Sequence, residues 1–415
     1  MDFSARYDVA VIGGGIAGAA AAIQAARCGK KTVLVEKNIL LGGLATSGLV
    51  YIYLPICDGN GHQICYGIAE ELMRNSLELG PGEIPPNWRQ EKNAPENKRF
   101  FCIFSPAAFM LSLEELLMKN GVELWLDTLV CSAESSGDRI TAAVVENESG
   151  RGRIEADCFI DASGSSVLAR RLGLPCIEEE NILTVWALTH AEEQSSAFGK
   201  NLVSAQFTAA SLEPEHLLWM KPEIREKLYP GLSDDDFRKK ILYRGLSGKT
   251  VTDFVLESHR WLREYYRMEQ AKEPNGRSKI YPVKLPLMPN FRKTYALETE
   301  FILKDGENNR PFEDSIGLLP DWRKAGPVWE VPFRTLYTRR MKNLLAAGRC
   351  TGASGDAWEI TRVIPAAAVT GQVAGLAAAS VCEQRKAVYD LSVPELQQKL
   401  RQLGFRLKLS EIEGL

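Results

Sequence analysis

The sequence contains little histidine and no closely spaced pair of cysteines. Its 415 residues include four histidines, and its nine cysteines are scattered without a Cys-x-x-Cys motif. Zinc sites need such ligands at short spacings, and His190, His216 and His259 do not provide one, so we expect no metal. An odd number of scattered cysteines argues against a disulfide framework and favours a reducing compartment. We therefore expect mostly buried thiols in a cytoplasmic protein.

An excess of charge of one sign is also missing. The 50 Lys and Arg residues nearly balance the 53 Asp and Glu residues, which leaves a formal net charge of −3. Nucleic-acid-binding proteins are usually more basic, so we expect no nucleic-acid partner. A composition with 45% hydrophobic and 25% charged residues is typical of a soluble globular protein, and the length predicts two or three domains.

Long hydrophobic runs are scarce. Residues 365–382 carry no charge and approach the minimum length of a membrane span, but they are mainly Ala, Gly, Ser, Thr and Val. This stretch is too weakly apolar for a span, so we predict a buried helix and no membrane partner. Only residues 1–6 precede the first apolar run, and we expect no signal peptide.

The first 36 residues indicate a βαβ unit. Tyr7–Ile12 and Thr32–Glu36 are short apolar runs, and Ile16–Cys28 between them is an alanine-rich helical stretch closed by Gly29. Two parallel strands joined by one helix are typical of dinucleotide-binding folds. Beyond this unit we predict a helix over 105–121, strands over 122–134, 140–145, 153–160, 184–189, 202–207, 279–302 and 329–336, and a charged helical region over 213–272.

The turn of this unit carries a glycine fingerprint. Gly13, Gly15 and Gly18 fill a G-x-G-x-x-G pattern directly after a strand and at the start of a helix. The first glycine permits a tight turn, the second lets a pyrophosphate approach the backbone, and the third allows close helix–sheet packing. The helix N-terminus then offers N–H donors to the phosphates. Glu36, at the end of the second strand, is placed to accept ribose hydroxyl hydrogen bonds.

Three later segments distinguish between NAD and FAD as the dinucleotide. Leu41–Gly48 holds a glycine pair among small residues, which lets the backbone run along a dinucleotide toward a flavin. Cys158–Gly164 reads as a buried strand that ends in an acidic, small-residue turn suited to the same phosphates. Asn343–Cys350 and Thr361–Pro365 lead into the Ala/Gly-rich helix, whose N-terminus could face the pyrimidine end of a flavin and stabilise a reduced anion.

In this order the four segments resemble the FAD-dependent oxidoreductases of the glutathione-reductase-like two-dinucleotide-fold superfamily, in particular the broad bacterial FAD-dependent oxidoreductase family. The resemblance covers about residues 7–380 and is weakest over 190–275. The matching C-terminal residues are Ala347-Gly348-Arg349, Arg362-Val363, Pro365, Gly371-Gln372 and Ala374-Gly375. The segments Phe291-Arg292, Phe312–Gly317 and Val331–Arg334 also look like the region that precedes this element in the family.

The resemblance implies FAD as the cofactor. It also implies that Val130, on the strand after the first long helix, meets the adenine through its backbone. The cofactor-binding residues expected on these grounds are Gly13, Gly15, Ile16, Ala17, Gly18, Glu36, Lys37, Gly42, Gly43, Leu44, Ala45, Thr46, Val130, Ala162, Ser163, Gly164, Gly348, Arg349, Arg362, Val363 and Ile364.

Two features found in some enzymes of this superfamily are missing from the sequence, and their absence narrows the possible class of flavoenzyme. Its disulfide reductases carry a close cysteine pair after the glycine pair, whereas residues 44–56 contain no cysteine, and Cys57 and Cys65 form at best a loose pair. No second strand-linked G-x-G-x-x-G is present, which argues against a separate NADPH domain. The unidentified electron acceptor is then another small molecule, oxygen or a protein.

Candidate catalytic residues are less clearly marked. A flavin enzyme needs polar groups that orient its small-molecule substrate and often a base that moves a proton. His62, in the polar loop Asp58–His62, is one candidate, with an ordinary surface histidine as the alternative. Arg292 and Arg334 suit a carboxylate or an oxyanion, with structural ion pairs as the alternative. Arg362 fits a position beside the flavin better.

We predict an α/β fold with a discontinuous Rossmann-like FAD-binding domain, residues 1–180 and 335–382. A mixed α+β substrate or cap domain, 181–334, is inserted between, with a helical insertion over about 213–272, and a helical tail follows over 383–415. The expected function is hydride transfer between a small organic substrate and FAD, bound noncovalently because Gly42–Gly48 lacks His and Cys. An NAD-dependent dehydrogenase and a non-catalytic flavin-binding module, acting through the 213–272 helices, stay as alternatives.

Overall fold

The computed structural model describes residues 2–90, 99–208 and 222–412. The chain divides into two compact units. Unit 1 comprises Met1–Gly43, Ile52–Ile177 and Tyr295–Leu415, and unit 2 comprises Leu44–Tyr51 and Glu178–Thr294. The α/β class agrees with the prediction, and unit 1 is discontinuous in the sequence.

The predicted domain boundary at residue 334 differs from this division, because Tyr295–Arg334 belongs to unit 1. Strand β15 (Tyr295–Leu297) pairs with β9 (Cys176–Glu178), which fixes the start of the returning segment. The hairpin of β16 (Ser315–Pro320) and β17 (Val328–Pro332) then packs through β16 on the C-terminal helices. The tail also belongs to this unit. Sequence patterns predict strands in this region but not the sheet that each strand joins.

The main sheet of unit 1 aligns the carboxyl ends of its parallel strands. Strands β1 (Phe3–Ile12), β2 (Thr32–Val35), β5 (Glu123–Trp125), β8 (Gly150–Asp161) and β18 (Leu344–Ala346) are parallel, in the order β5-β2-β1-β8-β18. Ile12 lies level with Val35 and Asp161, and Asp161 lies level with Ala346. The turns that follow these strands therefore leave the sheet at one edge, where ligands bind in open α/β sheets.

Two antiparallel strands extend this sheet beyond β8. They are β7 (Arg139–Asn147) and β6 (Leu129–Ser136). The strand structure predicted over 122–134 consists of two strands, β5 and β6, which are separated near Asp127 with its positive φ of 48°. The remaining elements of unit 1 are β3 (Ile52–Tyr53), β4 (Cys102–Ile103), α2 (Ile68–Asn75), α3 (Pro106–Lys119), α4 (Val167–Arg171), α9 (Gly355–Thr361) and α11 (Val393–Gln402).

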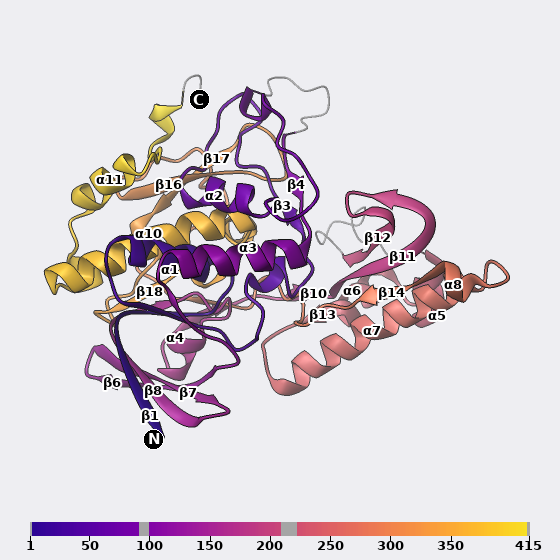
Figure 1. Cartoon of the computed structure of the whole chain (residues 1–415), viewed down its shortest axis with the longest axis horizontal. Coiled ribbons are helices and arrows are strands. Elements are labelled where there is room, and N and C mark those ends of the chain that lie inside the picture. Colours follow the sequence, from indigo (N-terminus) through magenta and orange to yellow (C-terminus); the bar gives the residue numbers. More distant parts are fainter. Residues whose placement is uncertain (1, 91–98, 209–221, 413–415) are drawn as a thin grey trace. The chain divides into compact units, whose positions relative to one another are not determined.

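Helices α1 (Ile16–Arg27) and α10 (Ile364–Gln384) pack against each other without side chains at the closest points (Figure 1). A Cβ atom at Gly371 would overlap the carbonyl oxygen of Ala17, and one at Gly375 would overlap that of Ala21. Alpha10 is the one helix of the described residues that is long and apolar enough to cross a membrane, and 94% of its most apolar window is buried inside the structure. The predicted buried helix is confirmed.

Unit 2 combines a small antiparallel sheet with amphipathic helices. Its sheet has the order β12 (Gly199–Thr208), β11 (Thr184–Ser196), β14 (Ile280–Lys284), and β10 (Asn181–Ile182) pairs with β13 (Leu242–Tyr243). The helices are α5 (Pro222–Leu228), α6 (Asp234–Ile241), α7 (Gly248–Gln270) and α8 (Gly276–Lys279). Phe254 and Trp261 of α7 pack in an apolar core with Val185 and Ala187. The predicted helical region, 213–272, begins outside the described residues, over 213–221, and from α5 onward it consists of helices interrupted by the short strand β13.

Substituting Gly371 with Ala should destabilise the protein by about 1–3 kcal/mol, because the added methyl group forces the α1 and α10 backbones apart. Chemical denaturation followed by circular dichroism measures this change. Gly248→Ala, at the first position of α7 with open space around a Cβ, is the control and should be near neutral. Equal effects of the two substitutions would contradict the proposed close packing.

Candidate functional site

The glycine fingerprint forms a turn that only glycine permits at two positions. Gly13 has a φ of +105°, and a Cβ atom there would lie 2.6 Å from the carbonyl oxygen of Ala162. A Cβ atom at Gly18 would overlap the carbonyl oxygen of Gly13. The tight turn and the close helix–sheet packing predicted for these residues are confirmed, and they bring the start of α1 directly over the end of β1.

Gly15 differs from Gly13 and Gly18, because no neighbouring atom would clash with a side chain at this position. Its φ of −70° and ψ of 179° suit any residue, and a Cβ atom there would meet nothing within 4 Å. Gly15 is the N-cap of α1, and no side chain caps this N-terminus. The open space above uncapped helical N–H groups is the surface that a pyrophosphate needs. The residues around Gly15, including Ile16 and Ala17, therefore fit a dinucleotide.

The second predicted segment lies against this turn. The N–H of Gly42 donates to the carbonyl oxygen of Gly14 at 2.8 Å, and Gly15 and Gly42 form a parallel bridge. A Cβ atom at Gly43 would lie 3.1 Å from the Cα of Gly15. The glycine pair thus extends the same backbone surface. The next predicted residues, Leu44, Ala45 and Thr46, belong to unit 2.

The third segment is held by a buried carboxylate. Asp161 accepts hydrogen bonds from the Ser163 hydroxyl at 2.6 Å and from the Leu168 N–H at 2.8 Å, which fixes the turn between β8 and α4. Burial raises the pKa of Asp161, while these hydrogen bonds oppose the shift. The turn residue Ala162 donates to the carbonyl oxygen of Ile12 at 2.9 Å. Ala162–Gly164 therefore borders the fingerprint, as predicted.

The fourth segment joins the same surface from β18. Gly348 has a φ of +63°, and a Cβ atom there would lie 2.8 Å from the Cβ of Ala17. The guanidinium of Arg349 occupies the space that a side chain at Gly164 would need. Burial lowers the pKa of Arg349 to about 10. The structure thus brings three of the predicted segments and the Leu41–Gly43 part of the second segment together in unit 1.

Two residues that support this surface were not among the predicted contacts. Thr370 of α10 accepts a hydrogen bond from the N–H of Gly348 at 3.0 Å, and Asp161 holds the turn after β8. An acid at the end of a buried strand was a visible signal for Asp161. A lone threonine inside an alanine-rich helix gave no signal for Thr370, because its partner lies 22 residues away in the chain.

Glu36 organises the loop as well as bordering it. This buried carboxylate accepts hydrogen bonds from the N–H of Gly14 at 2.7 Å and from the N–H of Asn38 at 2.9 Å. The Glu36 carbonyl accepts from the N–H of Thr128 at 3.0 Å, which brings the start of β6 to the same place. Its contact with a ribose stays a prediction, and Lys37 beside it is exposed.

The predicted adenine contact, Val130, is buried on β6 and pairs with Val145 of β7. The strand that directly follows the long helix α3 is β5, so the predicted position of Val130 is corrected to the second strand after this helix. The chain turns at Asp127 between the two strands, and sequence periodicity alone did not reveal that break.

The N-terminus of α10 has the predicted local geometry. Val363 is its N-cap and Ile364 its first residue, and no side chain caps it. Arg362, directly before, is held by Glu359, with its Nε 2.8 Å from the carboxylate. The arginine is therefore positioned by a local ion pair at the end of α9.

The three candidate catalytic residues occupy separate environments. The Nδ1 of His62 lies 2.9 Å from the carboxylate of Asp58 in unit 1. Arg334, also in unit 1, donates from its backbone N–H, Nε and Nη2 to Asp314 at 2.9–3.1 Å. Arg292 belongs to unit 2, where its guanidinium lies 5.8 Å from the ring centre of Trp186.

The described cysteines are free thiols, five of them buried and four partly buried. Burial raises the pKa of the Cys65 thiol, so it is a poor nucleophile. No cluster of three or more His, Cys, Asp or Glu residues in the described part of the chain could hold a metal ion.

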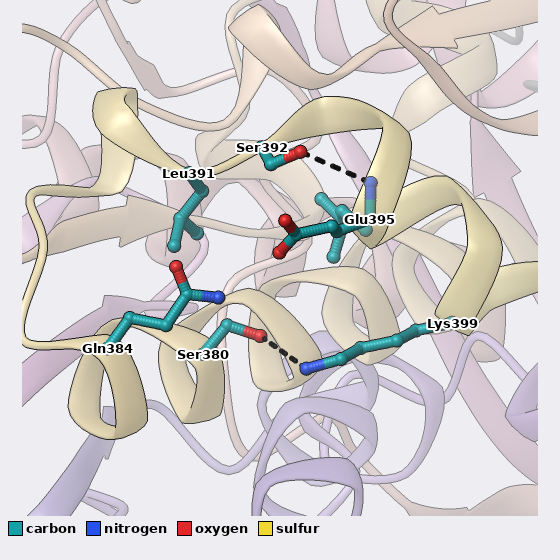
Figure 2. Close-up of a pocket in the computed structure, with 7 residues that line it drawn as sticks. Ser380, Gln384, Leu391, Ser392, Glu395 and Lys399 are labelled. Carbon is teal, nitrogen blue, oxygen red and sulfur yellow. Dashed lines mark hydrogen bonds between the residues drawn. The ribbon is translucent and has the colours of Figure 1, made fainter.

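One small pocket lies at the opposite end of α10, beside α11 (Figure 2). Three of its polar side chains are hydrogen-bonded: Ser392 accepts from the N–H of Glu395 at 3.4 Å, and Lys399 donates to Ser380 at 3.4 Å. Ser380 lies roughly 24 Å along the helix from Ile364, by the α-helical rise. This pocket is therefore separate from the glycine-lined surface. Its lining residues are Ser380, Gln384, Leu391, Ser392, Glu395, Leu396 and Lys399.

Residues 8–400 match the protein family described as FAD dependent oxidoreductase. The chain belongs to this family. Its cofactor is accordingly FAD, and the four segments that the structure assembles are those that carried the predicted resemblance. The family assignment also makes the protein an oxidoreductase enzyme and a flavoprotein of the glutathione-reductase-like superfamily.

Several curated relatives are reductases. The chain is 22% identical over 306 residues to a digeranylgeranylglycerophospholipid reductase of Thermoplasma volcanium, covering 69% of each chain. It is 27% identical over 187 residues to the enzyme of the same name from Picrophilus torridus, covering 42% of this chain and 46% of the relative. It is also 28% identical over 207 residues to a dihydrolipoamide dehydrogenase of Chaetomium thermophilum, covering 49% and 38%. Two of these matches thus span less than half of the relative.

Among solved structures, a geranylgeranyl bacteriochlorophyll reductase-like protein of Thermoplasma acidophilum is similar with a TM-score of 0.49 and 15% identity. The match covers 96% of this chain and 83% of that protein.

Substituting Gly15 with Val should weaken FAD binding at least tenfold while changing the free energy of unfolding by less than about 1 kcal/mol. The added side chain enters open space in the folded protein, and it would occupy the expected position of the FAD pyrophosphate. Flavin fluorescence titration and denaturation measure the two effects. Gly18→Val is the contrast, because its side chain overlaps Gly13 and should disrupt folding. Unchanged FAD affinity of the Gly15 variant would rule out this phosphate position.

Proposed function

We propose that this FAD-dependent oxidoreductase transfers a hydride between a small organic substrate and noncovalently bound FAD. The observation that carries the proposal is the convergence of four glycine-containing turns on one sheet edge, with open space at Gly15. The reductase and dehydrogenase names among the relatives support a two-electron reaction. The absence of His and Cys from Gly42–Gly48 supports noncovalent binding, and we propose a cytoplasmic location.

The chain provides distinct groups for distinct parts of FAD. The N-terminus of α1 would hold the pyrophosphate, Glu36 the ribose, and the Gly42–Gly43 backbone the adjoining length of the cofactor. The uncapped N-terminus of α10, at Val363, would stabilise negative charge on the flavin ring. FAD, when bound, supplies the centre that accepts or donates the hydride.

We assign the proton transfer to His62, oriented by Asp58. Asp58 is fully buried, and its Oδ1 accepts from the N–H groups of Asn60 at 2.8 Å and of His62 at 3.1 Å. Its Oδ2 is thereby aimed at the Nδ1 of His62, at 2.9 Å. With Nδ1–H donated to Asp58, the Nε2 of His62 carries the lone pair that accepts or returns a substrate proton. The imidazole is 22% exposed and therefore reachable.

Arg334 better suits a structural role than a substrate contact. Its backbone and side chain together make three hydrogen bonds to Asp314, and its guanidinium also stacks over Phe301, 5.1 Å from the ring centre. A bidentate carboxylate partner already occupies the face that would bind a substrate anion. We therefore assign Arg334 to holding the loop before β18.

The absorption spectrum of the purified protein is the first test. Bands near roughly 370 and 450 nm, with FAD released into the supernatant after heat denaturation, would support the proposal. Anaerobic screening for compounds that bleach these bands would then identify substrates, and reoxidation by candidate acceptors would follow. A colourless protein that binds NAD instead of FAD would favour an NAD-dependent dehydrogenase. A flavin that no small molecule reduces would favour a non-catalytic flavin-binding module.

His62→Gln should slow flavin reduction by about 10²- to 10⁴-fold with the first substrate found, because the oriented base is lost. The FAD dissociation constant should stay unchanged. Stopped-flow absorbance at the flavin band measures the rate, and His259→Gln on α7 is a control that should reduce flavin normally. A His62 variant as fast as the control would remove His62 from the reaction.

A further inference from the structure

Unit 2 contains two buried asparagines with opposite hydrogen bonding. Asn181 is 3% exposed and makes three hydrogen bonds: its Oδ1 accepts from the N–H groups of Arg292 at 2.7 Å and Lys293 at 2.8 Å, and its Nδ2 donates to the Lys293 carbonyl at 2.5 Å. Asn290 is 1% exposed, and neither its Oδ1 nor its Nδ2 has a partner within the described structure. A buried amide without partners is strongly unfavourable, so native proteins rarely keep one without a bound group to satisfy it.

Two more unpartnered polar atoms lie on segments that contact the Asn290 region. The hydroxyl of Ser47 and the indole N–H of Trp186 are buried and have no partner among the described residues. The N–H of Leu287 donates to the carbonyl oxygen of Ser47 at 2.7 Å. A Cβ atom at Gly48 would lie 2.9 Å from the Oδ1 of Asn290, so this amide faces the Ser47–Gly48 backbone.

Both segments also meet at Trp186. The ring of Tyr51 lies 5.1 Å from that of Trp186, and the guanidinium of Arg292 lies 5.8 Å from it. Two segments, residues 47–51 and 287–292, therefore lie beside each other, and both contact β11 at Trp186. All of these residues belong to unit 2.

This region is not part of the apolar core of unit 2. Val185 and Ala187, the neighbours of Trp186 along β11, point into that core. Because side chains alternate along a strand, Trp186 points to the opposite face of the sheet. The unpartnered Trp186 indole therefore lies on the face that the helices of unit 2 do not use for packing.

We propose that Asn290, together with Ser47 and Trp186, binds a ligand group that presents a hydrogen-bond acceptor beside a donor. Asn290 offers an acceptor and two donors, the Trp186 indole offers one donor, and the Ser47 hydroxyl offers either. A carbonyl oxygen next to an N–H or O–H matches this set. The pyrimidine edge of the flavin carries such a group, and so does an amide or hydroxy-acid substrate. The identity of the ligand rests on the proposed function, whereas the unpaired state of Asn290 does not.

Replacing each asparagine with leucine tests whether the Asn290 amide is reserved for a ligand. In the FAD-free full-length protein, Asn290→Leu should leave the melting temperature unchanged or raise it, because no hydrogen bond is lost. Asn181→Leu, the matched control, should lower it clearly, because three hydrogen bonds are lost. This comparison needs no bound flavin, so it is independent of the FAD spectrum that tests the proposed function.

Binding measurements then separate the two sources of the ligand group. FAD and lumiflavin are titrated into the FAD-free protein, and lactamide, which carries a carbonyl beside both O–H and N–H groups, into both the FAD-free and the FAD-loaded protein. A five- to tenfold weaker binding of FAD and lumiflavin by Asn290→Leu assigns the site to the flavin. If Asn290→Leu weakens the binding of lactamide but not that of FAD or lumiflavin, the site is assigned to a substrate.

Two results would overturn the proposal. One is a loss of melting temperature in Asn290→Leu as large as that in Asn181→Leu, which would make Asn290 a structural residue. The other is unchanged binding of FAD, lumiflavin and lactamide by the Asn290 variant.

Discussion

The contact between the carbonyl oxygen of Gly13 and the Cα of Gly18 is the constraint on which the candidate cofactor site of unit 1 depends. It lets α1 begin directly over the end of β1, so the helix N-terminus and the strand end share one place. A side chain at Gly18 would lift the helix and remove its N–H groups from the sheet edge. Every later segment of the candidate site is positioned relative to this turn: Gly42 bonds to it, Ala162 abuts it, and Gly348 packs on the first turn of α1.

Close contact between backbones also joins α1, near the N-terminus, to α10, near the C-terminus. Gly371 and Gly375 let α10 lie against α1, so a segment near residue 370 supports a loop near residue 15. The amide of Gln372 reinforces this pairing by donating to Gln24 at 2.9 Å and accepting from the N–H of Ile68 at 2.7 Å. The candidate cofactor surface is consequently built from distant segments, and its geometry depends on helix packing rather than on one continuous motif.

The buried polar side chains around the glycine turns differ from those around Asn290. Around the glycine turns of unit 1, Glu36 and Asp161 are buried, and the protein backbone satisfies them. In unit 2, the Asn290 amide and the Trp186 indole N–H are buried without hydrogen-bond partners. A buried polar group that is hydrogen-bonded to the protein stabilises a preformed surface. A buried polar group without such a bond is free to form a hydrogen bond with a ligand. We infer that unit 1 is prepared to receive the dinucleotide and that unit 2 contributes recognition of a further polar group.

The sequence by itself determined the βαβ unit, the glycine turn, the buried C-terminal helix and the family, because these depend on local spacing and periodicity. For example, Gly13, Gly15 and Gly18 form the complete glycine fingerprint within six consecutive residues. Tertiary structure alone decided that residues 295–334 join unit 1 and that Val130 lies on β6, the second strand after α3. It also decided that the guanidinium of Arg334 is hydrogen-bonded to Asp314. It also decided that Asn181 is paired while Asn290 is not. Hydrogen-bond partners far apart in the chain are set by packing, and a residue's identity does not reveal which partner it finds.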